Sequence, residues 1–229
     1  MNKRVITTVL LLLALSAIAC TCSLPGLSNL LGDSNTDAGK PPAANALFFD
    51  DFSNPDSGWD HRNDASGTTD YYNGQYRILV LESNIDLWAN PNTSFPADVI
   101  IEVQAYKNDG PDDNDFGVMC RYQGVDNYVF FVISSDGYAA IGKMEDGSQN
   151  LLNPEGQMVP VDALPTGEGI TYQIRAECVG PNLALFVNGK KIMEAQDPAP
   201  AAGDVGLMAG TFDTPGTDIL FDNFTVLAP

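Results

Sequence analysis

Residues 114–144 constrain the fold more than any other part of the chain. They contain apolar runs of strand length, rich in β-branched and aromatic residues, which are separated by the short segments GVDN and SSDG. Gly, Asp, Asn and Ser are the residues that tight turns require. The stretch therefore predicts two successive antiparallel hairpins.

In the first hairpin, a loop over residues 124–127 places Gln123 opposite Tyr128. Because side chains alternate between the two faces of a strand, this register assigns each residue to one face. The core face then holds Val118, Cys120, Tyr122, Val129, Phe131 and Ile133, and the other face holds Met119, Arg121, Gln123, Tyr128 and Phe130. The second face is mixed, so it either meets solvent or lines a binding groove.

Further strands are predicted on both sides of this stretch. Residues 99–107 and 170–179 alternate apolar and polar side chains, as half-buried antiparallel strands do. Asn188-Gly189 is a strong hairpin signal between two more runs. The remaining strands are predicted over residues 47–53, 70–81, 85–88, 158–161, 183–187, 190–196, 204–212 and 218–227. No helical period is sustained, so we predict an all-β chain whose strands form two packed sheets.

The composition fits one exported β domain. The chain of 229 residues has 11 Lys and Arg against 30 Asp and Glu, a net charge of -19. Such a surface repels phosphate backbones and anionic lipids, which argues against nucleic acid as a partner. Two explanations of the acidity stay open: it attracts cations such as calcium, or it only keeps an exported protein soluble.

The amino terminus predicts an export signal. Lys3 and Arg4 precede an apolar run over residues 5–18, which is too short to prefer spanning a bilayer. The boundary AIAC resembles the lipobox of bacterial lipoproteins, in which the cysteine becomes the acylated first residue. We therefore expect a signal peptide over residues 1–19 and a lipid anchor on Cys20. The alternative is an ordinary cleaved signal that leaves Cys20 and Cys22 as spare thiols.

Residues 20–45 predict a tether between this anchor and the folded domain. They are rich in Ser, Gly, Pro, Asn and Asp and show no sustained period, a composition typical of flexible linkers. The domain over residues 46–229 would then be held at the membrane of the cell envelope, outside the cytoplasm.

Cys120 and Cys178 both fall on the core-facing side of their predicted strands. In an exported protein, two buried cysteines on neighbouring strands are expected to be bridged. We predict a structural disulfide between them, with two buried free thiols as the alternative.

Several segments of the chain also carry a family resemblance: FFDDFSNPDSGW, DNDFGVMCRYQGVDNYVFFVISSDGYAAIGKM, LALFVNGKKI, GDVGLMAGTF and ILFDNFTV. In this order they resemble the concanavalin A-like lectin/glucanase superfamily, near its laminin-G-like and 3-keto-disaccharide-hydrolase-type branches. The resemblance covers residues 47–227 and implies a jelly-roll sandwich of two antiparallel sheets, one of them concave. It also implies carbohydrate as the commonest class of ligand among the relatives, although a fold alone does not assign a function.

The resemblance further implies a structural calcium ion. In the superfamily the first and last strands lie side by side, and some members hold calcium there with a C-terminal aspartate and backbone carbonyls. Asp222 matches that aspartate, and Asp51 and loop carbonyls near Asn73-Gly74 would have to join it because calcium takes six to eight oxygens. The alternative is that Asp222 is a strand-edge residue bonded to the backbone.

Signals for catalysis are weak. The Glu-x-Asp-x-x-Glu strand motif of the β-glucanases is absent, and Glu102 and Glu177 stand alone on their strands. Glycoside hydrolysis requires two carboxyl groups at a defined separation, which a sequence does not show. His61, the only histidine, lies in a polar loop and is interpreted as a loop residue. The aspartates of residues 108–115 are interpreted as a solvated turn.

Sugar recognition favours an aromatic platform beside planar hydrogen-bonding groups. Residues of this kind on the non-core side of their strands are Arg121, Tyr128, Gln173, Arg175 and Glu177, with Trp88 and Tyr138 near possible rims. The alternative places Arg175 and Glu177 on an outward surface and Trp59 and Trp88 in the core.

Together these patterns predict a lipid-anchored domain that binds carbohydrate or another cell-surface partner without catalysis. A hydrolase of the 3-keto-disaccharide type and a structural or adhesive envelope protein are the alternatives. A clustered carboxylate pair in the groove would favour the hydrolase, and a concave face filled by side chains would favour the structural role.

Overall fold

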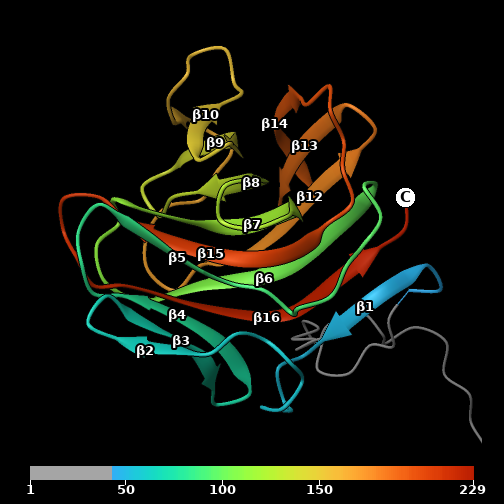
Figure 1. Ribbon diagram of the computed structural model, residues 1–229. Coiled ribbons are helices and arrows are strands. Elements are labelled where there is room, and N and C mark those ends of the chain that lie inside the picture. Colours follow the sequence, from blue (N-terminus) through green and yellow to red (C-terminus); the bar gives the residue numbers. More distant parts are fainter. Residues whose placement is uncertain (1–42) are drawn as a thin grey trace, which may run out of the picture. The chain divides into compact units, whose positions relative to one another are not determined.

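The computed structural model describes residues 43–229. The predicted signal peptide, the anchor at Cys20 and almost all of the tether lie outside this part. Residues 43–229 form an all-β sandwich of two antiparallel sheets (Figure 1). No helix in this part is long and apolar enough to cross a bilayer.

The larger sheet has nine strands in the order β14-β13-β12-β6-β16-β4-β3-β2, with β1 also beside β16. Its strands are β1 (Ala46–Asp50), β2 (Arg62–Asp64), β3 (Gly67–Tyr72), β4 (Gln75–Val80), β6 (Val99–Asp109), β12 (Thr171–Val179), β13 (Asn182–Val187), β14 (Lys190–Gln196) and β16 (Thr217–Leu227).

The smaller sheet has seven strands in the order β10-β9-β8-β7-β15-β5, with β11 also beside β9. Its strands are β5 (Ile85–Ala89), β7 (Asn114–Tyr122), β8 (Tyr128–Ile133), β9 (Tyr138–Glu145), β10 (Ser148–Leu151), β11 (Val159–Pro160) and β15 (Asp204–Thr211). Residues 114–144 thus form the two predicted hairpins as β7, β8 and β9.

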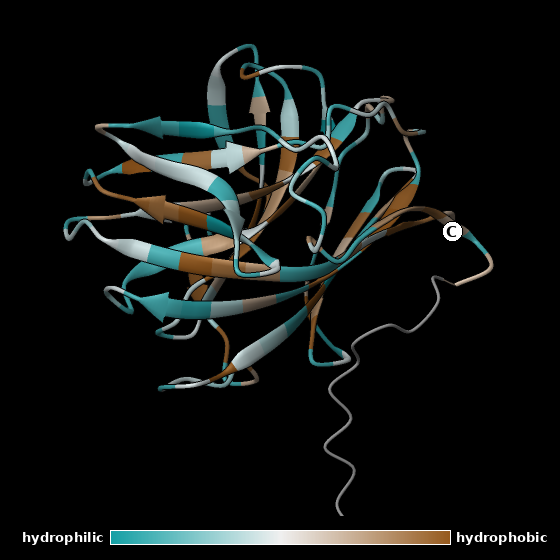
Figure 2. Ribbon diagram, turned by 90° about the horizontal axis from the view of Figure 1, so that it is seen from below, coloured by the Kyte–Doolittle hydropathy of each residue, from teal (hydrophilic) through white to brown (hydrophobic). Residues whose placement is uncertain are grey.

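Alternate side chains of both sheets form the core between them. On β4, for example, Tyr76, Ile78 and Val80 are fully buried, while the residues between them are half-buried. Apolar segments alternate with polar ones along the strands, and polar residues gather in the turns (Figure 2). Each fully buried aliphatic or aromatic side chain contributes about 1.5–3 kcal/mol relative to exposure.

The first hairpin of the smaller sheet differs from the prediction in its register. Cys120 pairs with Val129, whereas the predicted loop pairs it with Phe131. The difference is two residues, so the faces of the paired residues do not change. The predicted core residues Val118, Cys120, Val129, Phe131 and Ile133 are all buried between the sheets.

A β-bulge after Cys120 reverses the faces of the residues that follow. Arg121 has a φ of 58°, and the pairing of β7 with β15 shifts at this point. An extra residue in one strand turns the next side chains to the opposite face. Tyr122, predicted in the core, therefore packs on the outer face, and the prediction that Arg121 shares a face with Tyr128 is wrong.

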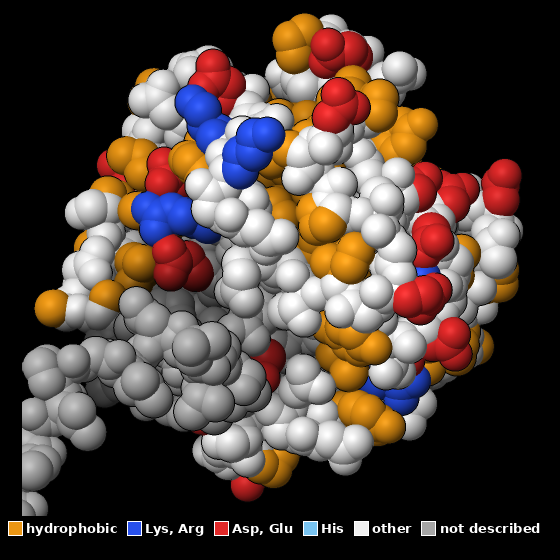
Figure 3. Space-filling model, turned by 180° about the vertical axis from the view of Figure 1, so that it is seen from behind, with side chains coloured by type: hydrophobic (Ala, Val, Ile, Leu, Met, Phe, Trp, Pro, Cys, Tyr) orange, Lys and Arg blue, Asp and Glu red, His pale blue; other side chains and the backbone are white. Residues whose placement is uncertain are grey.

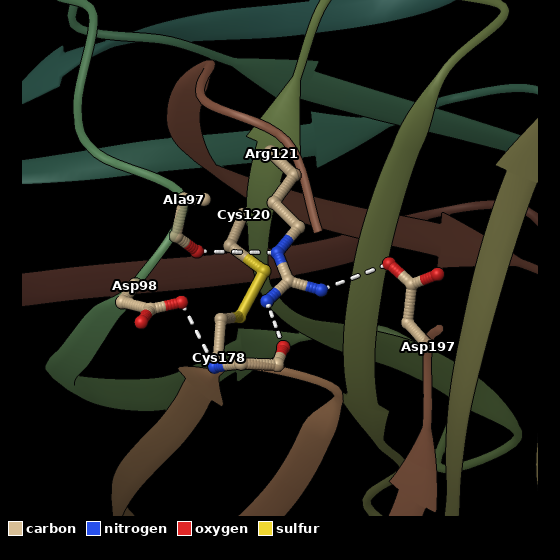
Figure 4. The surroundings of a disulfide bond; sticks show 7 residues. Ala97, Asp98, Cys120, Arg121, Cys178 and Asp197 are labelled. Atoms are coloured by element: carbon tan, nitrogen blue, oxygen red, sulfur yellow. Dashed lines mark hydrogen bonds and ion pairs between the residues drawn. A yellow bond between two sulfur atoms is a disulfide. The ribbon is translucent and has the colours of Figure 1, made fainter. Parts of the chain in front are cut away.

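The side chain of Arg121 is instead buried among polar groups at the end of the sandwich (Figure 4). Its guanidinium donates to the Asp197 carboxylate at 2.8 Å, to the Gly180 carbonyl at 2.7 Å and to the Ala97 carbonyl at 3.2 Å. Gly180 follows β12, so these bonds join β7 to the larger sheet. Arg121 thus has a structural role.

The predicted disulfide between Cys120 and Cys178 is confirmed, with both cysteines fully buried. Cys120 lies in β7 and Cys178 in β12, so the bond joins the two sheets rather than neighbouring strands of one sheet. Figure 4 shows it next to the bonds of Arg121, and the two features fasten the same end of the sandwich.

The first and last strands of the described part pair with each other. β1 runs antiparallel to β16, with Asp50 opposite Phe224, and the Ala228 amide donates to the Asn45 carbonyl at 2.9 Å. Figure 1 shows the C-terminus close to β1. This pairing is the one that the family resemblance implies.

Candidate functional site

The outer face of the smaller sheet carries a groove of about 670 Å³, called here the main groove. Its walls come from the start of β7, from β8, β9 and β10, and from the loop before β11. The groove is lined by Asp113, Asn114, Asp115, Phe130, Val132, Ser134, Asp136, Tyr138, Ala140, Gln149, Leu151, Gly156, Gln157, Met158 and Phe212. A groove of this volume is in the range of small-molecule sites.

Four aromatic side chains, called here the aromatic strip, lie on the same face of the sheet. They are Trp88, Tyr122, Tyr128 and Phe130. The rings of Tyr122 and Tyr128 are 5.7 Å apart, and those of Tyr128 and Phe130 are 6.1 Å apart. The Trp88 Nε1 atom donates to the Tyr122 hydroxyl at 3.3 Å. Phe130 also lines the main groove, so the strip continues from it along the sheet.

Two carboxyl groups, Asp86 of β5 and Asp115 of β7, form what is called here the acid pair. The strand β15 lies between them, and Gly210 is the cross-strand partner of both residues. Neighbouring strands are about 4.8 Å apart, so side chains two strands apart meet only by leaning over the middle strand. A Cβ atom at Gly210 would lie 2.1 Å from Asp86 Oδ1 and 2.4 Å from Asp115 Oδ1. The missing side chain of Gly210 therefore lets the two carboxyl groups approach.

The acid pair has no compensating cation. Within residues 43–229, no Lys, Arg or His forms an ion pair with Asp86 or Asp115. Asp115 Oδ1 is buried and has no hydrogen-bond partner among these residues. Burial raises the pKa of Asp86, and burial together with the charge of Asp86 raises the pKa of Asp115 well above its ordinary value. One proton is therefore held by the pair where exposed aspartates are ionised.

The hydroxyl of Tyr128 remains protonated beside the acid pair. Burial raises the pKa of Tyr128 to about 12, and the charge of Asp86 adds to the effect. Only 5% of Tyr128 is exposed, so its contribution to the site is a protonated hydroxyl rather than an open ring face. The main groove, the aromatic strip and the acid pair together supply apolar surfaces and oxygen groups on one face of the sheet.

Sequence reasoning missed the acid pair. It interpreted Asp115 as part of a solvated turn, whereas Asp115 lies in β7 and is partly buried. Asp86 was part of a predicted strand and received no role. The usable signal was Gly210, because a glycine inside a strand often marks a close approach of other groups.

The predicted ligand-binding residues do not form one patch. Tyr128 lies on the outer face of the smaller sheet, and Arg121 is buried at its end. Gln173, Arg175 and Glu177 lie in β12, on the outer face of the larger sheet. The two sheets are packed core to core, so Tyr128 and the β12 residues face opposite directions.

The three β12 residues border a separate depression of about 490 Å³. Arg175 donates to Glu102 at 2.5 Å and to Glu177 at 2.9 and 2.8 Å, so its charge is matched by these two acids. The alternative interpretation, in which Arg175 and Glu177 belong to an outward surface, fits this placement.

The other aromatic residues singled out from the sequence lie partly in the core and partly at the surface. Trp59 is in the core, with 2% of its surface exposed, and its Nε1 donates to Asp50 at 2.9 Å. Trp88 is only partly buried and belongs to the aromatic strip, and Tyr138 is exposed at the main groove. His61 is an exposed residue 2.9 Å from Asp70.

The structure brings Asp51 and Asp222 close enough to interact, as the calcium prediction requires. Burial raises the pKa of Asp222, and the charge of Asp51 contributes to the rise. The Asp51 carboxylate accepts hydrogen bonds from the Ser53 amide at 3.1 Å and hydroxyl at 2.6 Å. Two carboxylates supply fewer than the six to eight oxygens that calcium takes. Within residues 43–229, no group of three or more His, Cys, Asp or Glu is arranged for a metal. Calcium binding here stays a prediction.

Comparison with known proteins identifies the fold. No family model and no curated protein matches the chain. Among solved structures, the carbohydrate-binding module CBM66 from Bacillus subtilis is 18% identical with a TM-score of 0.59, over 75% of this chain and 96% of that one. A protein of unknown function with a galectin-like fold, also from Bacillus subtilis, is 12% identical with a TM-score of 0.62, over 82% and 97%.

A third similar structure is the β-glucanase of Bacillus licheniformis. It is 10% identical with a TM-score of 0.57, over 80% of this chain and 97% of that one. These similarities define an all-β jelly-roll protein. The chain has the concanavalin A-like fold that its sequence predicts.

Proposed function

We propose that this protein is a non-catalytic carbohydrate-binding domain whose ligand lies in the main groove and on the aromatic strip. The observation that carries the proposal is the combination, on one sheet face, of the main groove, the acid pair and accessible aromatic rings. These rings are the partly buried Trp88 and Tyr122 and the exposed Tyr138, whereas Tyr128 and Phe130 are buried beside them. Aromatic rings stack on the apolar faces of sugars, and carboxyl and tyrosine groups bond to hydroxyls. Two of the similar structures, a carbohydrate-binding module and a β-glucanase, support the same ligand class.

The acid pair is a clustered carboxylate pair of the kind that would favour a hydrolase, but the spacing of its carboxyl groups argues against glycoside hydrolysis by this pair. Retaining enzymes separate their two carboxyl groups by about 5–5.5 Å and inverting enzymes by about 6.5–9.5 Å. Here the Oδ1 atoms of Asp86 and Asp115 both lie within 2.4 Å of the position that a Cβ atom on Gly210 would occupy. That arrangement leaves no room for a sugar carbon or a water molecule between the two groups.

The open volume of the main groove argues against a purely structural or adhesive role. A face used only for packing would be filled by its own side chains, whereas this groove encloses about 670 Å³.

Binding to soluble oligosaccharides tests the proposal. We expect titration calorimetry with gluco-, xylo- and mannotetraose to detect at least one ligand without release of reducing ends. Trp88→Ala should weaken that binding about tenfold, since an aromatic contact contributes about 0.5–1.5 kcal/mol beyond its burial. Arg175→Ala, on the opposite sheet, is the matched control and should bind as the wild type does. Equal loss in both variants, or loss only in the control, contradicts the proposed site.

We also propose that the domain is held outside the cytoplasm by a lipid on Cys20. The lipobox-like segment before Cys20 and the linker composition of residues 20–45 support this placement. Mass spectrometry of the mature protein should find an acylated N-terminal cysteine, and Cys20→Ala should release the protein from membranes. Membrane fractions that retain the variant unchanged would contradict the anchor.

A further inference from the structure

The acid pair has the features of a ligand-binding group rather than a structural one. A structural carboxylate in the interior is paired with a cation or with hydrogen-bond donors, as Asp197 is with Arg121. Asp115 Oδ1 has neither among residues 43–229, although it is buried and its residue lines the main groove. A buried oxygen without a partner costs free energy, which a purely structural carboxylate would not leave uncompensated.

The acid pair offers a hydrogen-bond donor and hydrogen-bond acceptors next to each other above Gly210. Two carboxyl groups that converge over Gly210 without a cation retain one proton between them. The protonated group then donates one hydrogen bond, and the remaining oxygens accept. Two hydroxyl groups on adjacent carbons of a sugar present a matching acceptor and donor.

The surroundings select against charged sugars. The residues that line the main groove include Asp113 and Asp136 in addition to Asp115, and none of the lining residues is Lys, Arg or His. Acidic side chains also gather along one edge of the face shown in Figure 3. Sugars that carry carboxylate or sulfate groups would be repelled here, because like charges in a partly buried site are weakly screened.

We propose that Asp86 and Asp115 share one proton and together bind two adjacent hydroxyl groups of an uncharged sugar, so that loss of the proton weakens binding. This inference rests on the proposed carbohydrate-binding function and names its ligand class. The titratable group that faces the pair is Tyr128 of β8, which contacts Tyr122 of β7, and Asp113 and Asp136 lie at the groove. Burial raises the pKa of Tyr128 to about 12, so Tyr128 stays protonated from pH 5 to pH 9, and we expect the pair itself to control the pH dependence.

Titration calorimetry with the tetraose identified above, between pH 5 and pH 9, tests the inference. Wild-type affinity should fall about tenfold or more as the pH rises, because deprotonation of the acid pair removes one hydrogen bond to the ligand. Asp115→Asn should bind with an affinity that does not change between pH 5 and pH 9, because an amide supplies a donor and an acceptor at every pH. Trigalacturonate should bind more weakly than the neutral tetraose at every pH.

Two further variants keep the experiment decisive. Asp56→Asn removes an exposed acid outside the main groove and should keep the wild-type pH profile. Gly210→Ala places a methyl group between the carboxyl groups and should abolish binding while the near-ultraviolet spectrum of the buried Trp59 stays native. Carbon-13 NMR of aspartate carboxyl groups should show one group still protonated when the exposed aspartates have ionised.

The outcomes separate this inference from the function on which it rests. A wild-type profile that is flat from pH 5 to pH 9, or an Asp115→Asn variant that fails to bind although folded, overturns the shared proton and leaves carbohydrate binding intact. Preference for trigalacturonate overturns the choice of uncharged sugars. Absence of binding by every oligosaccharide at every pH overturns the proposed function and this inference together.

Discussion

Gly210 decides how the most unusual residues of this protein meet. Asp86 and Asp115 are separated by a whole strand, and only the absence of a side chain between them allows their carboxyl groups to converge. No local pattern in the sequence contains this information, because the pair depends on β15, nearly one hundred residues later, lying between β5 and β7. Parity along a single strand, by contrast, placed Cys120 and Cys178 in the core correctly.

Removing one charge from the acid pair should stabilise the fold at neutral pH. An aspartate with a raised folded-state pKa binds a proton more tightly in the folded state, so stability falls as the pH rises above the unfolded value of about 3.9. Asp115→Asn removes this penalty. We expect a gain on the order of 1 kcal/mol at pH 7 and none at pH 3.5, measured by urea unfolding. Asp113→Asn, an exposed control, should change stability little at either pH.

At the scale of elements, the bulge in β7 explains the main error of sequence reasoning. Strict alternation put Arg121 beside Tyr128 and Tyr122 in the core, and it was correct up to Cys120. The extra residue at Arg121 is stabilised by contacts with Gly180 and Asp197, which are distant in the sequence. A bulge that depends on such partners has no signal in its own strand.

The buried ion pair at this bulge should be sensitive to the loss of one partner. Burial alone would raise the pKa of Asp197, but the Ala199 amide, Lys143 and Arg121 hold it below its ordinary value. Asp197 therefore stabilises the fold above about pH 4, and this contribution is lost as the pH falls through the lowered pKa. Asp197→Ala should cost about 3–5 kcal/mol in urea unfolding at pH 7.

A double variant tests whether the cost comes from the unpaired charge. Arg121→Met combined with Asp197→Leu should recover much of the stability, because apolar residues of similar volume replace buried ion pairs at little cost. A double variant as unstable as Asp197→Ala alone would mean that packing, and not the charge of Arg121, accounts for the loss.

The disulfide should stabilise the fold mainly by restricting the unfolded chain. The bond spans 58 residues, and closing a loop of that length stabilises a fold by about 4 kcal/mol in the chain-entropy model. Reduction under native conditions, or Cys120→Ala with Cys178→Ala, should lower the free energy of unfolding by about this amount. Equal stability with and without reductant would contradict this prediction.

At the scale of the whole molecule, alternation and turn residues along the chain predicted the all-β class and the two packed sheets, and the family resemblance implied the jelly-roll fold. Together they predicted the hairpin neighbours and the pairing of the first and last strands, but not the order of the other strands within each sheet. The residues assigned to one binding patch were therefore divided between opposite faces of the sandwich. The net charge of -19 follows from the composition. That three of the aspartates, Asp113, Asp115 and Asp136, line one groove could be seen only from the fold.

Calcium at Asp51 and Asp222 would act on the whole molecule, because these residues lie where the first and last strands pair. If the ion binds there, calcium at about 100 times its dissociation constant should stabilise the fold by about 2.7 kcal/mol. Asp222→Asn should remove this gain, while Asp113→Asn should keep it. A melting temperature that is the same in calcium and in chelator would exclude the ion.

Because β1 pairs with β16, the two ends of the folded part, at Asn45 and Ala228, lie next to each other. A short peptide could join these two positions, and new ends could be cut in an exposed turn such as Asn188-Gly189. The strand order of both sheets would survive this circular permutation. A surface that holds the chain before Asn45 or after Ala228 would pull on the same strand pair, so β1 and β16 would be the first strands to separate under force.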